Sequence, residues 1–309
     1  MTKWTTAEIP DQTGRTVLIT GANAGLGLVS ARTLAAKGAR VLLACRNPER
    51  GTSALQQVAA AGPAEPELVE LDLADLSSVR AAAERVREIT GDELDVLMNN
   101  AGVMAPPHST TRDGFELQIG TNHLGHAALP WLLAPALKPG ARVVTLSSVA
   151  HLNGGLDLDD LNFQRRRYTP FRAYSQSKLA NLLFALELDR AARRAGRDLV
   201  SVAAHPGISG TDLINNMTGN HALPDLVQRG VDAASRLVTQ SAEQGALPQL
   251  HAATAPGITG GAYYGPDGFR EYWGHPKRAA ASPAAQDERT AERLWERTAE
   301  LTGIAADPR

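Results

Sequence analysis

Cysteine is almost absent from this sequence, and so are long apolar runs and any excess of one charge. The single cysteine, Cys45, excludes an intramolecular disulfide and a cysteine-based zinc cluster, so any redox chemistry must come from a cofactor. No apolar run approaches the length of a membrane-spanning helix, and the polar residues 1–6 lack a signal-peptide core. Because 31 Lys and Arg balance 33 Asp and Glu to a net charge of −2, nothing indicates a nucleic-acid partner or an anionic membrane. We expect a cytoplasmic protein without a membrane anchor.

The sequence does contain a regular alternation of short apolar runs with longer helical patterns. A chain of 309 residues that is 43% hydrophobic can bury a large core. This alternation predicts an α/β fold, a doubly wound, seven-stranded parallel sheet of the Rossmann type in a single domain. The domain is expected over residues 1–275, followed by a C-terminal tail, residues 276–309, with one amphipathic helix.

The predicted elements follow one another along the chain. The expected strands are residues 16–20, 40–45, 67–71, 94–98, 142–146, 199–204 and 261–264. The expected helices are residues 25–37, 48–61, 77–89, 113–137, 174–195, 225–238 and 241–253.

A glycine-rich turn, Thr20-Gly21-Ala22-Asn23-Ala24-Gly25-Leu26-Gly27, joins the first predicted strand to the first helix. In such a unit the first glycine lets the chain reverse, and the later ones let backbone N–H groups approach a pyrophosphate. The spacing TGxxxGxG differs from the GxGxxG of many dehydrogenases. The turn predicts a dinucleotide site, and a glycine-rich turn without a ligand is the alternative.

Arg46 follows the second predicted strand, where an acidic residue would bind the adenosine ribose hydroxyls in many dinucleotide folds. A guanidinium at this place suits a ribose 2′-phosphate. We therefore expect NADP(H) to be preferred, with NAD(H) as the alternative cofactor. A solvated surface arginine is the other interpretation.

Polar residues also stand at or near the carboxyl ends of later strands. Asn99-Asn100-Ala101-Gly102 ends the fourth strand, where small residues can lie against a ligand or simply form a turn. Ser147 and Ser148 follow the fifth strand, and either hydroxyl could polarise a substrate oxygen. Asn122 lies inside a predicted helix, which indicates a functional role or a local break in the helix.

Tyr174 and Lys178 are one helical turn apart, so both project from the same helix face. A tyrosine hydroxyl can exchange a proton with a carbonyl or an alcohol, although its ordinary pKa is about 10. The Lys178 ammonium would lower that pKa and could donate to a cofactor ribose. Taken alone, a Tyr-x-x-x-Lys pair is usually just a surface pair.

In this order the motifs resemble the short-chain dehydrogenase/reductase family over about residues 14–265. The resemblance implies a catalytic tetrad of Asn122, Ser148, Tyr174 and Lys178, with Ser148 chosen as the second serine of the SS-x-A pattern and Asn122 as the holder of a relay water. It also implies that Asp72 and Leu73 flank the adenine and that Pro206 and Gly207 border the nicotinamide. The full expected cofactor set is Gly21, Asn23, Ala24, Gly25, Leu26, Gly27, Arg46, Asp72, Leu73, Asn100, Ala101, Gly102, Tyr174, Lys178, Pro206, Gly207 and Thr211.

Within the family, Ala44-Cys45-Arg46-Asn47 and the residues around Asn122 are similar to the retinol dehydrogenase-like branch, whose members usually prefer NADP. The resemblance implies an oxidoreductase that interconverts a small-molecule alcohol and a ketone or aldehyde. A loop at about 150–171 and a lid at about 208–223 are expected to shape the substrate pocket. Many relatives pair across subunits, so a homo-oligomer is compatible with the resemblance.

Three other interpretations use the same residues. A nucleotide-sugar epimerase or dehydratase shares the fold and the Tyr-x-x-x-Lys pair, but the glycine spacing and the lack of a substantial C-terminal domain argue against it. A cofactor-bound sensor without turnover would be expected to have lost a tetrad residue, and all four are present. His123 and His126 are spaced like metal ligands, but no acidic partner completes a zinc signature, so we expect no metal.

Overall fold

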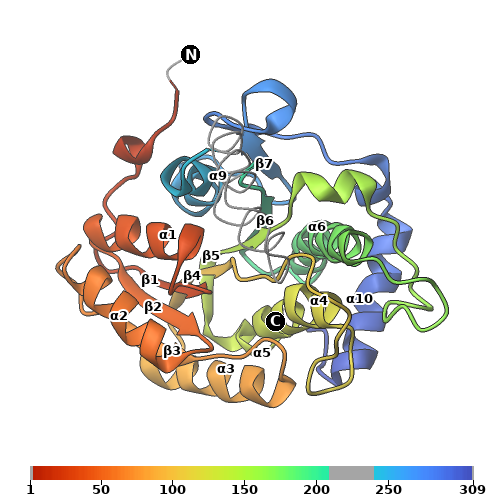
Figure 1. The fold of residues 1–309 in the computed structure, drawn as a ribbon. Coiled ribbons are helices and arrows are strands. Elements are labelled where there is room, and N and C mark those ends of the chain that lie inside the picture. Colours follow the sequence, from red (N-terminus) through yellow and green to blue (C-terminus); the bar gives the residue numbers. More distant parts are fainter. Residues whose placement is uncertain (1–2, 209–239, 308–309) are drawn as a thin grey trace, which may run out of the picture.

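Eight strands form one sheet in the computed structural model, which describes residues 3–208 and 240–307 (Figure 1). The prediction of a doubly wound sheet with seven parallel strands is confirmed, and the sheet has one strand more than expected. Strands β1 to β7 are parallel to their neighbours, and the additional strand β8 is antiparallel to β7. In spatial order the strands are β3 (Glu67–Glu70), β2 (Arg40–Cys45), β1 (Thr16–Thr20), β4 (Leu94–Asn99), β5 (Leu137–Leu146), β6 (Leu199–Ala204), β7 (Tyr263–Pro266) and β8 (Pro276–Arg278).

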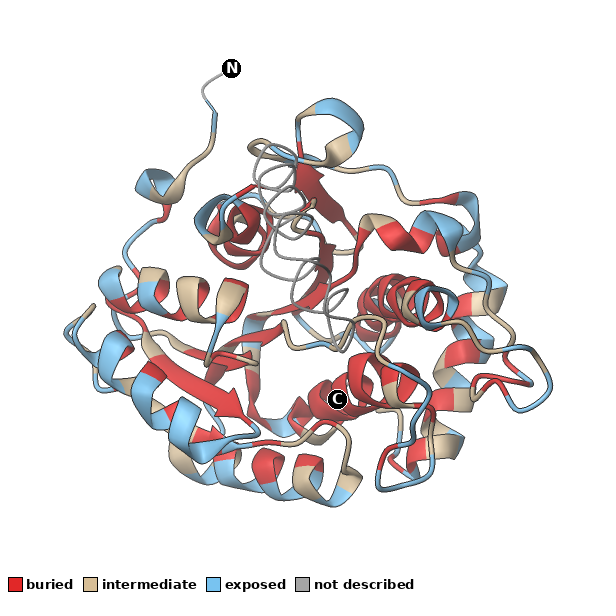
Figure 2. Ribbon diagram, viewed as in Figure 1, coloured by how far each residue is buried: buried red, intermediate tan, exposed pale blue. Residues whose placement is uncertain are grey.

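Alternate residues of the central strands face two different hydrophobic cores. In β1, Val17 and Ile19 belong to one cluster and Leu18 to the other, as the two-residue period of a strand requires. The first cluster includes side chains of α1 (Gly25–Ala36), α2 (Pro48–Ala59) and α9 (Ala242–Thr254). The second includes side chains of α3 (Leu76–Thr90), α5 (Gly125–Leu132) and α6 (Pro170–Arg194). Figure 2 shows the result, buried strands between helices whose outer faces are exposed.

Side chains next to the helix ends explain where several helices begin and stop. The Asn47 carboxamide accepts a hydrogen bond from the Arg50 amide at 2.8 Å, and Pro48 occupies the first turn of α2. Asp75 caps α3 by accepting from the Ser77 amide at 2.8 Å. Gly91 then ends α3 with a left-handed φ of 60°.

The prediction of a single helix over residues 113–137 is wrong. The helical segment begins at α4 (Leu117–Ile119), because the Glu116 carboxylate accepts from the amides of the next turn. It continues as the π-helical turn Gly120–Leu124 and then as α5, and a short 3-10 turn (Ala134–Ala136) follows. Strand β5 already starts at Leu137. Asn122 lies inside the π-helical turn, so the local break that this asparagine indicates is present.

The C-terminal residues pack onto the rest of the chain. The predicted amphipathic helix is α10 (Glu288–Thr302), whose Leu294 is fully buried beside α6. The Trp295 ring stacks on Phe184 of α6 with a centroid distance of 5.4 Å. Strand β8 was not predicted, because its three residues include two exposed basic side chains and carry no apolar pattern. Other short turns are residues Thr6–Glu8, Val149–Asn153, Phe269–Glu271 and Pro283–Gln286.

Two expectations fall largely outside the described residues. Of the predicted lid at about 208–223, only residue 208 is described, and the helix expected at 225–238 lies outside altogether. The helix expected at 241–253 is confirmed as α9, with bounds one residue later at each end.

Candidate active site

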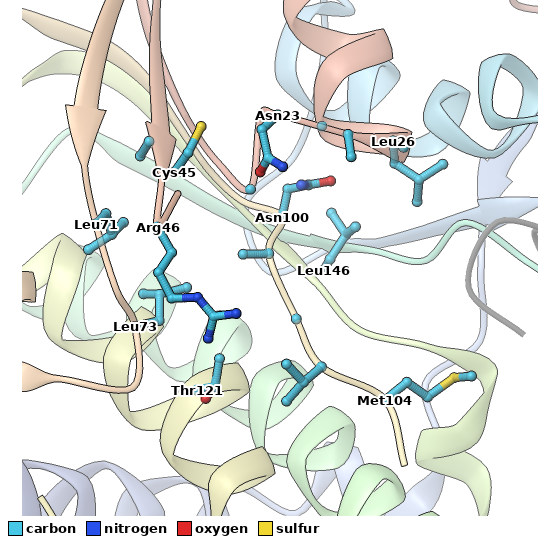
Figure 3. A pocket seen from close by; sticks show the side chains of 18 of the residues that line it. Asn23, Leu26, Cys45, Arg46, Leu71, Leu73, Asn100, Met104, Thr121 and Leu146 are labelled. Atoms are coloured by element: carbon cyan, nitrogen blue, oxygen red, sulfur yellow. The ribbon is translucent and has the colours of Figure 1, made fainter. Parts of the chain in front are cut away.

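A cavity of about 570 Å³ opens at the carboxyl ends of the parallel strands (Figure 3). Its lining comes from the glycine-rich turn, from the residues after β2, β3 and β4, and from α6. This is the edge at which ligands bind in open α/β sheets, and the volume is in the range of small-molecule and cofactor sites. Fifteen of the expected cofactor residues line it: Gly21, Asn23, Ala24, Gly25, Leu26, Gly27, Arg46, Asp72, Leu73, Asn100, Ala101, Gly102, Tyr174, Lys178 and Pro206.

The glycine-rich turn is packed so closely that two of its glycines admit no side chain. Gly21 has a φ of +65°, which residues with a side chain rarely adopt. A Cβ atom on Gly27 would lie 2.4 Å from the Gly21 carbonyl oxygen and 2.6 Å from Asn100 Nδ2. The start of α1 therefore lies directly against the turn, and its first N–H groups border the cavity as a pyrophosphate site requires. These residues fit a dinucleotide.

Thr20 ties this turn to the loop that follows β4. Its hydroxyl oxygen accepts from the backbone amides of Asn100 and Ala101, each at 2.9 Å. The Asn100 carboxamide in turn donates to the Thr20 carbonyl oxygen at 2.7 Å. The two loops that form the floor of the cavity are thus fixed to each other.

His126 extends this network to the π-helical turn. Its Nδ1 donates to the Asn122 carbonyl oxygen at 3.0 Å, and its Nε2 lies 2.8 Å from the Thr20 hydroxyl. Burial lowers the pKa of His126 to about 3, so the ring is neutral at ordinary pH. A neutral ring that donates through Nδ1 accepts the Thr20 proton at Nε2.

Asn122 is held inside the π-helical turn by three hydrogen bonds from its side chain. Its Oδ1 accepts from the Val103 amide at 2.8 Å, and its Nδ2 donates to the Val103 carbonyl and the Ser177 hydroxyl, both at 2.9 Å. A Cβ atom on Gly102 would lie 3.2 Å from Asn122 Oδ1 and 3.5 Å from Lys178 Nζ. The loop after β4, the π-helical turn and α6 therefore meet at Gly102.

Tyr174 and Lys178 lie on the face of α6 that borders the cavity. Lys178 is 5% exposed, its Nζ lies 5.7 Å from the centre of the Tyr174 ring, and it donates to the Leu146 carbonyl at 3.1 Å. Tyr174 is half-buried and lines both this cavity and a second one. The expected pair is therefore on the same side of the sheet as the glycine-rich turn.

The two serines after β5 have different surroundings. The Ser147 hydroxyl donates to the Lys178 carbonyl at 2.8 Å and helps to hold α6. Ser148 begins the short helical turn Val149–Asn153, where its hydroxyl accepts from the Ala150 amide at 3.2 Å. Ser148 lines the second cavity together with Tyr174.

That second cavity, about 810 Å³, adjoins the first, because Met104, Tyr174 and Pro206 line both. Gly207, which is expected to border the nicotinamide with Pro206, lines this second cavity. Much of its lining is apolar, including Val149, Leu152 and Phe171. Thr211, the last expected cofactor residue, lies outside the described residues.

Several residues that line the first cavity were not predicted. Ala44, Cys45, Leu71 and Leu146 could have been found, because each stands at or next to the end of a strand whose neighbours were singled out. Thr121 comes from the π-helical turn, which the sequence pattern does not specify, and Val103 and Met104 from a loop without a motif. Burial raises the pKa of Cys45 to about 11, so its thiol stays protonated and is a packing group here.

The predicted histidine pair has structural partners. His123 Nε2 lies 2.9 Å from the Thr298 hydroxyl of α10, whereas His126 bonds Thr20 and Asn122. Among residues 3–208 and 240–307, no group of three His, Cys, Asp or Glu side chains is arranged to hold a metal ion. Within the same residues, no helix is long and apolar enough to cross a membrane.

Comparisons with known proteins agree with this geometry. A family model described as short chain dehydrogenase matches residues 15–221. Retinol dehydrogenase 13 of Homo sapiens is 40% identical over 298 residues, which cover 95% of this chain and 86% of that protein. A crystal structure of a Mycobacterium paratuberculosis protein is similar with a TM-score of 0.82 and 44% identity, covering 98% of each chain. A Burkholderia cenocepacia short chain dehydrogenase in complex with NADP has a TM-score of 0.62 and 25% identity, covering 82% of this chain and 96% of that one.

The fold, the nucleotide-sized cavity and the family match together identify an oxidoreductase of a class that uses a nicotinamide dinucleotide. The chain belongs to the short-chain dehydrogenase/reductase family, in its retinol dehydrogenase-like branch, and acts on CH–OH groups.

Proposed function

We propose that this enzyme interconverts an alcohol and an aldehyde or ketone with NADP(H), and that Tyr174 is its acid/base. The observation that carries the proposal is the position of Tyr174, which lines the nucleotide cavity and the second, more apolar cavity at once. A bound nicotinamide supplies or accepts the hydride. A substrate in the second cavity can then have its reacting carbon beside that ring and its oxygen beside the tyrosine.

Each tetrad residue has a distinct part in this proposal. In the reducing direction Tyr174 gives its proton to the carbonyl oxygen as the carbonyl carbon gains a hydride, and the product is the alcohol. The Lys178 ammonium, 5.7 Å from the ring centre, favours the phenolate that remains. Ser148, which lines the second cavity together with Tyr174, orients the carbonyl oxygen. Asn122 holds the π-helical turn beside Lys178, where a relay water would be bound.

NADP(H) is the proposed nucleotide because of the residues after β2. Arg46 extends from the end of that strand along the cavity (Figure 3), and its guanidinium suits a 2′-phosphate. The one acidic side chain among the described residues that line this cavity, Asp72, uses an oxygen to accept from the Ala74 amide at 3.0 Å. The solved neighbours include complexes with NADP and with NAD, so the choice between them rests on Arg46.

The test is Tyr174→Phe, which keeps the ring and removes the hydroxyl. Turnover of NADPH with a panel of aldehydes and ketones should fall by about a hundredfold or more, the usual contribution of a general acid. NADPH binding, followed by fluorescence titration, should persist. Tyr168→Phe is the matched control, because Tyr168 bonds Gln118 and the Pro106 carbonyl and lines neither cavity.

Undiminished turnover in Tyr174→Phe would contradict the assignment. A wild-type protein that binds NADPH but turns over no carbonyl or alcohol would instead favour the sensor interpretation.

A further inference from the structure

One wall of the second cavity carries charge, and the remaining described residues that line it are uncharged. The charged wall is the connection from β7 to β8 together with β8 itself, which contribute Arg270, Glu271 and Lys277. Tyr174 and Ser148 come from other elements, α6 and the end of β5. In this cavity the proposed reacting groups and the charged side chains therefore come from different elements.

The negative charge in this wall is already paired. Glu271 Oε1 lies 3.3 Å from Lys277 Nζ, and Glu271 Oε2 lies 3.1 Å from Nε2 of the buried His205. His205 donates this bond, because its Nδ1 accepts from the Gly207 amide at 3.2 Å and burial lowers the pKa of the ring. Burial alone would raise the pKa of Glu271, but the His205 hydrogen bond and the Lys277 charge together lower it. Glu271 is thus ionised, and it balances Lys277.

Arg270 is the charge that remains. Its guanidinium lies 5.4 Å from the centre of the Phe269 ring, and none of the ion pairs among the described residues includes it. Arg270 and Glu271 both have left-handed φ values, 50° and 61°, which are unfavourable for residues with a side chain. The Glu271 amide holds this turn by donating to the Gly268 carbonyl at 3.0 Å, and the Glu271 carboxylate anchors it to His205. The fold therefore keeps in the cavity wall an exposed cation that has no ion-pair partner among residues 3–208 and 240–307.

Exposed apolar side chains line the same cavity as this charged wall. Leu152 and Phe171 line the same cavity although they are 63% and 53% exposed. Phe269 precedes Arg270 and Trp273 follows it by three residues; they are 66% and 42% exposed. Within the described part of the chain, these four are the exposed large hydrophobic side chains; two line this cavity and two belong to the connection that carries Arg270. A ligand that matches both features has an apolar chain and an anionic group.

We infer that Arg270 selects substrates with an anionic group remote from the reacting carbonyl, and that the class is ω-oxo carboxylic acids with an apolar chain and the corresponding ω-hydroxy acids. The inference rests on the proposed function, since it takes Tyr174 and Ser148 as the place of the reacting carbonyl. The reaction is the same hydride and proton transfer, so the aldehyde becomes a primary alcohol. The carboxylate is unchanged and contacts the guanidinium.

The test compares ω-oxo carboxylic acids with unsubstituted aldehydes of equal chain length, using the full-length protein and NADPH. The acid should have a roughly two- to fivefold higher kcat/KM, as an exposed charge pair allows, and the ratio should fall with added salt. Arg270→Asn should bring the ratio to about one, because asparagine is neutral and tolerates a left-handed φ. Arg270→Lys should keep most of the preference. The matched control is Arg278→Asn, an exposed residue of β8 that does not line the cavity, and it should keep the full ratio.

The outcomes separate the two proposals. Equal kcat/KM for acids and neutral aldehydes, or a preference that survives in Arg270→Asn, would overturn the role of Arg270 and leave the proposed function standing. No turnover of any carbonyl would overturn the proposed function and this inference together. The NADPH dissociation constant of Arg270→Asn serves as the folding check, since Arg270 does not line the nucleotide cavity.

Discussion

At the scale of single residues, the site depends on a buried hydroxyl, that of Thr20, whose hydrogen-bonding capacity is used completely. The Thr20 hydroxyl has two lone pairs, which the Asn100 and Ala101 amides occupy, and one proton. His126 Nε2 receives that proton, because it lies at 2.8 Å whereas the Met98 carbonyl is 3.4 Å away. One buried hydroxyl therefore fixes the glycine-rich turn, the loop after β4 and a histidine ring.

Thr20→Val should remove these bonds while keeping the shape of the side chain. Two backbone amides and the histidine nitrogen would lose their partner, so the free energy of unfolding should fall by about 1 to 3 kcal/mol. NADPH affinity should fall as well, because, among the described residues, the bond from Asn100 to the Thr20 carbonyl is then the remaining link between the two cavity loops at Thr20. Thr20→Ser is the control, which keeps the hydroxyl and loses one methyl group, at a cost of about 1 kcal/mol. Urea denaturation of the two variants measures the difference, and equal losses would show that the hydroxyl is not the important group.

Arg46→Asp should move cofactor preference from NADPH toward NADH. An aspartate at this place repels a 2′-phosphate and can accept from ribose hydroxyls, so the ratio of kcat/KM values should fall by roughly tenfold or more. Arg50→Asp is the control, because Arg50 is exposed on α2 and does not line the cavity. An unchanged ratio in Arg46→Asp would show that this guanidinium does not contact the phosphate.

The residues next to strand ends were the part of the site that the sequence could predict. Gly21, Arg46, Asp72 and Asn100 each follow an apolar run, and parallel strands bring their carboxyl ends to one edge. His126 and Arg270 could not be found in this way. Their partners, Thr20 for His126 and the wall of the second cavity for Arg270, are far away in the sequence.

At the scale of elements, periodicity predicted the long regular helices and failed where hydrogen bonding departs from the α-helix. The apolar pattern around Asn122 continues without interruption, yet residues 120–124 form a π-helical turn. The Val103 backbone and Ser177, which hold Asn122 there, belong to other segments. Strand β8 was missed for a different reason: it has no apolar pattern of its own and is a strand because it pairs with β7.

The sequence predicted that helix α10 has an apolar face, but it did not predict which elements this face packs against. It packs on α6 through the fully buried Leu294 and the Trp295 ring, and Thr298 lies 2.9 Å from His123 in the π-helical turn. The C-terminal helix thus supports the two elements that carry Asn122 and Tyr174. This support connects the end of the chain to the candidate active site.

Leu294→Ala should lower the free energy of unfolding by about 2 to 5 kcal/mol, the usual cost of emptying a leucine site in a core. Glu296→Ala, two residues on and exposed, should change it by less than about 0.5 kcal/mol. Chemical denaturation followed by tryptophan fluorescence reports the effect, because Trp295 stacks on Phe184. A Leu294→Ala protein as stable as Glu296→Ala would show that α10 is not docked as described.

At the scale of the whole molecule, folding removes several histidines from water and keeps them neutral. Burial lowers the pKa of His123 to about 4 and that of His126 to about 3, and it also lowers the pKa of His151, His205 and His251. In the unfolded chain a histidine has a pKa of about 6.5, so below that pH the unfolded state binds protons that the folded state does not bind. Stability is therefore full above about pH 6.5 and falls with decreasing pH, down to the folded pKa of each ring.

For this reason the protein should unfold at a higher pH, on acidification, than it would if only its carboxylates titrated. One pH unit below 6.5, a histidine that stays neutral in the folded state costs about 1.4 kcal/mol, so His123 and His126 together cost about 3 kcal/mol of a stability that is usually about 5 to 15 kcal/mol. Urea midpoints measured from pH 7 to pH 5 should decline steadily. His251→Phe should flatten this decline, because it keeps the ring contacts with Trp4 and Tyr264 and removes one titrating group. A slope equal in the wild-type protein and in His251→Phe would contradict this account.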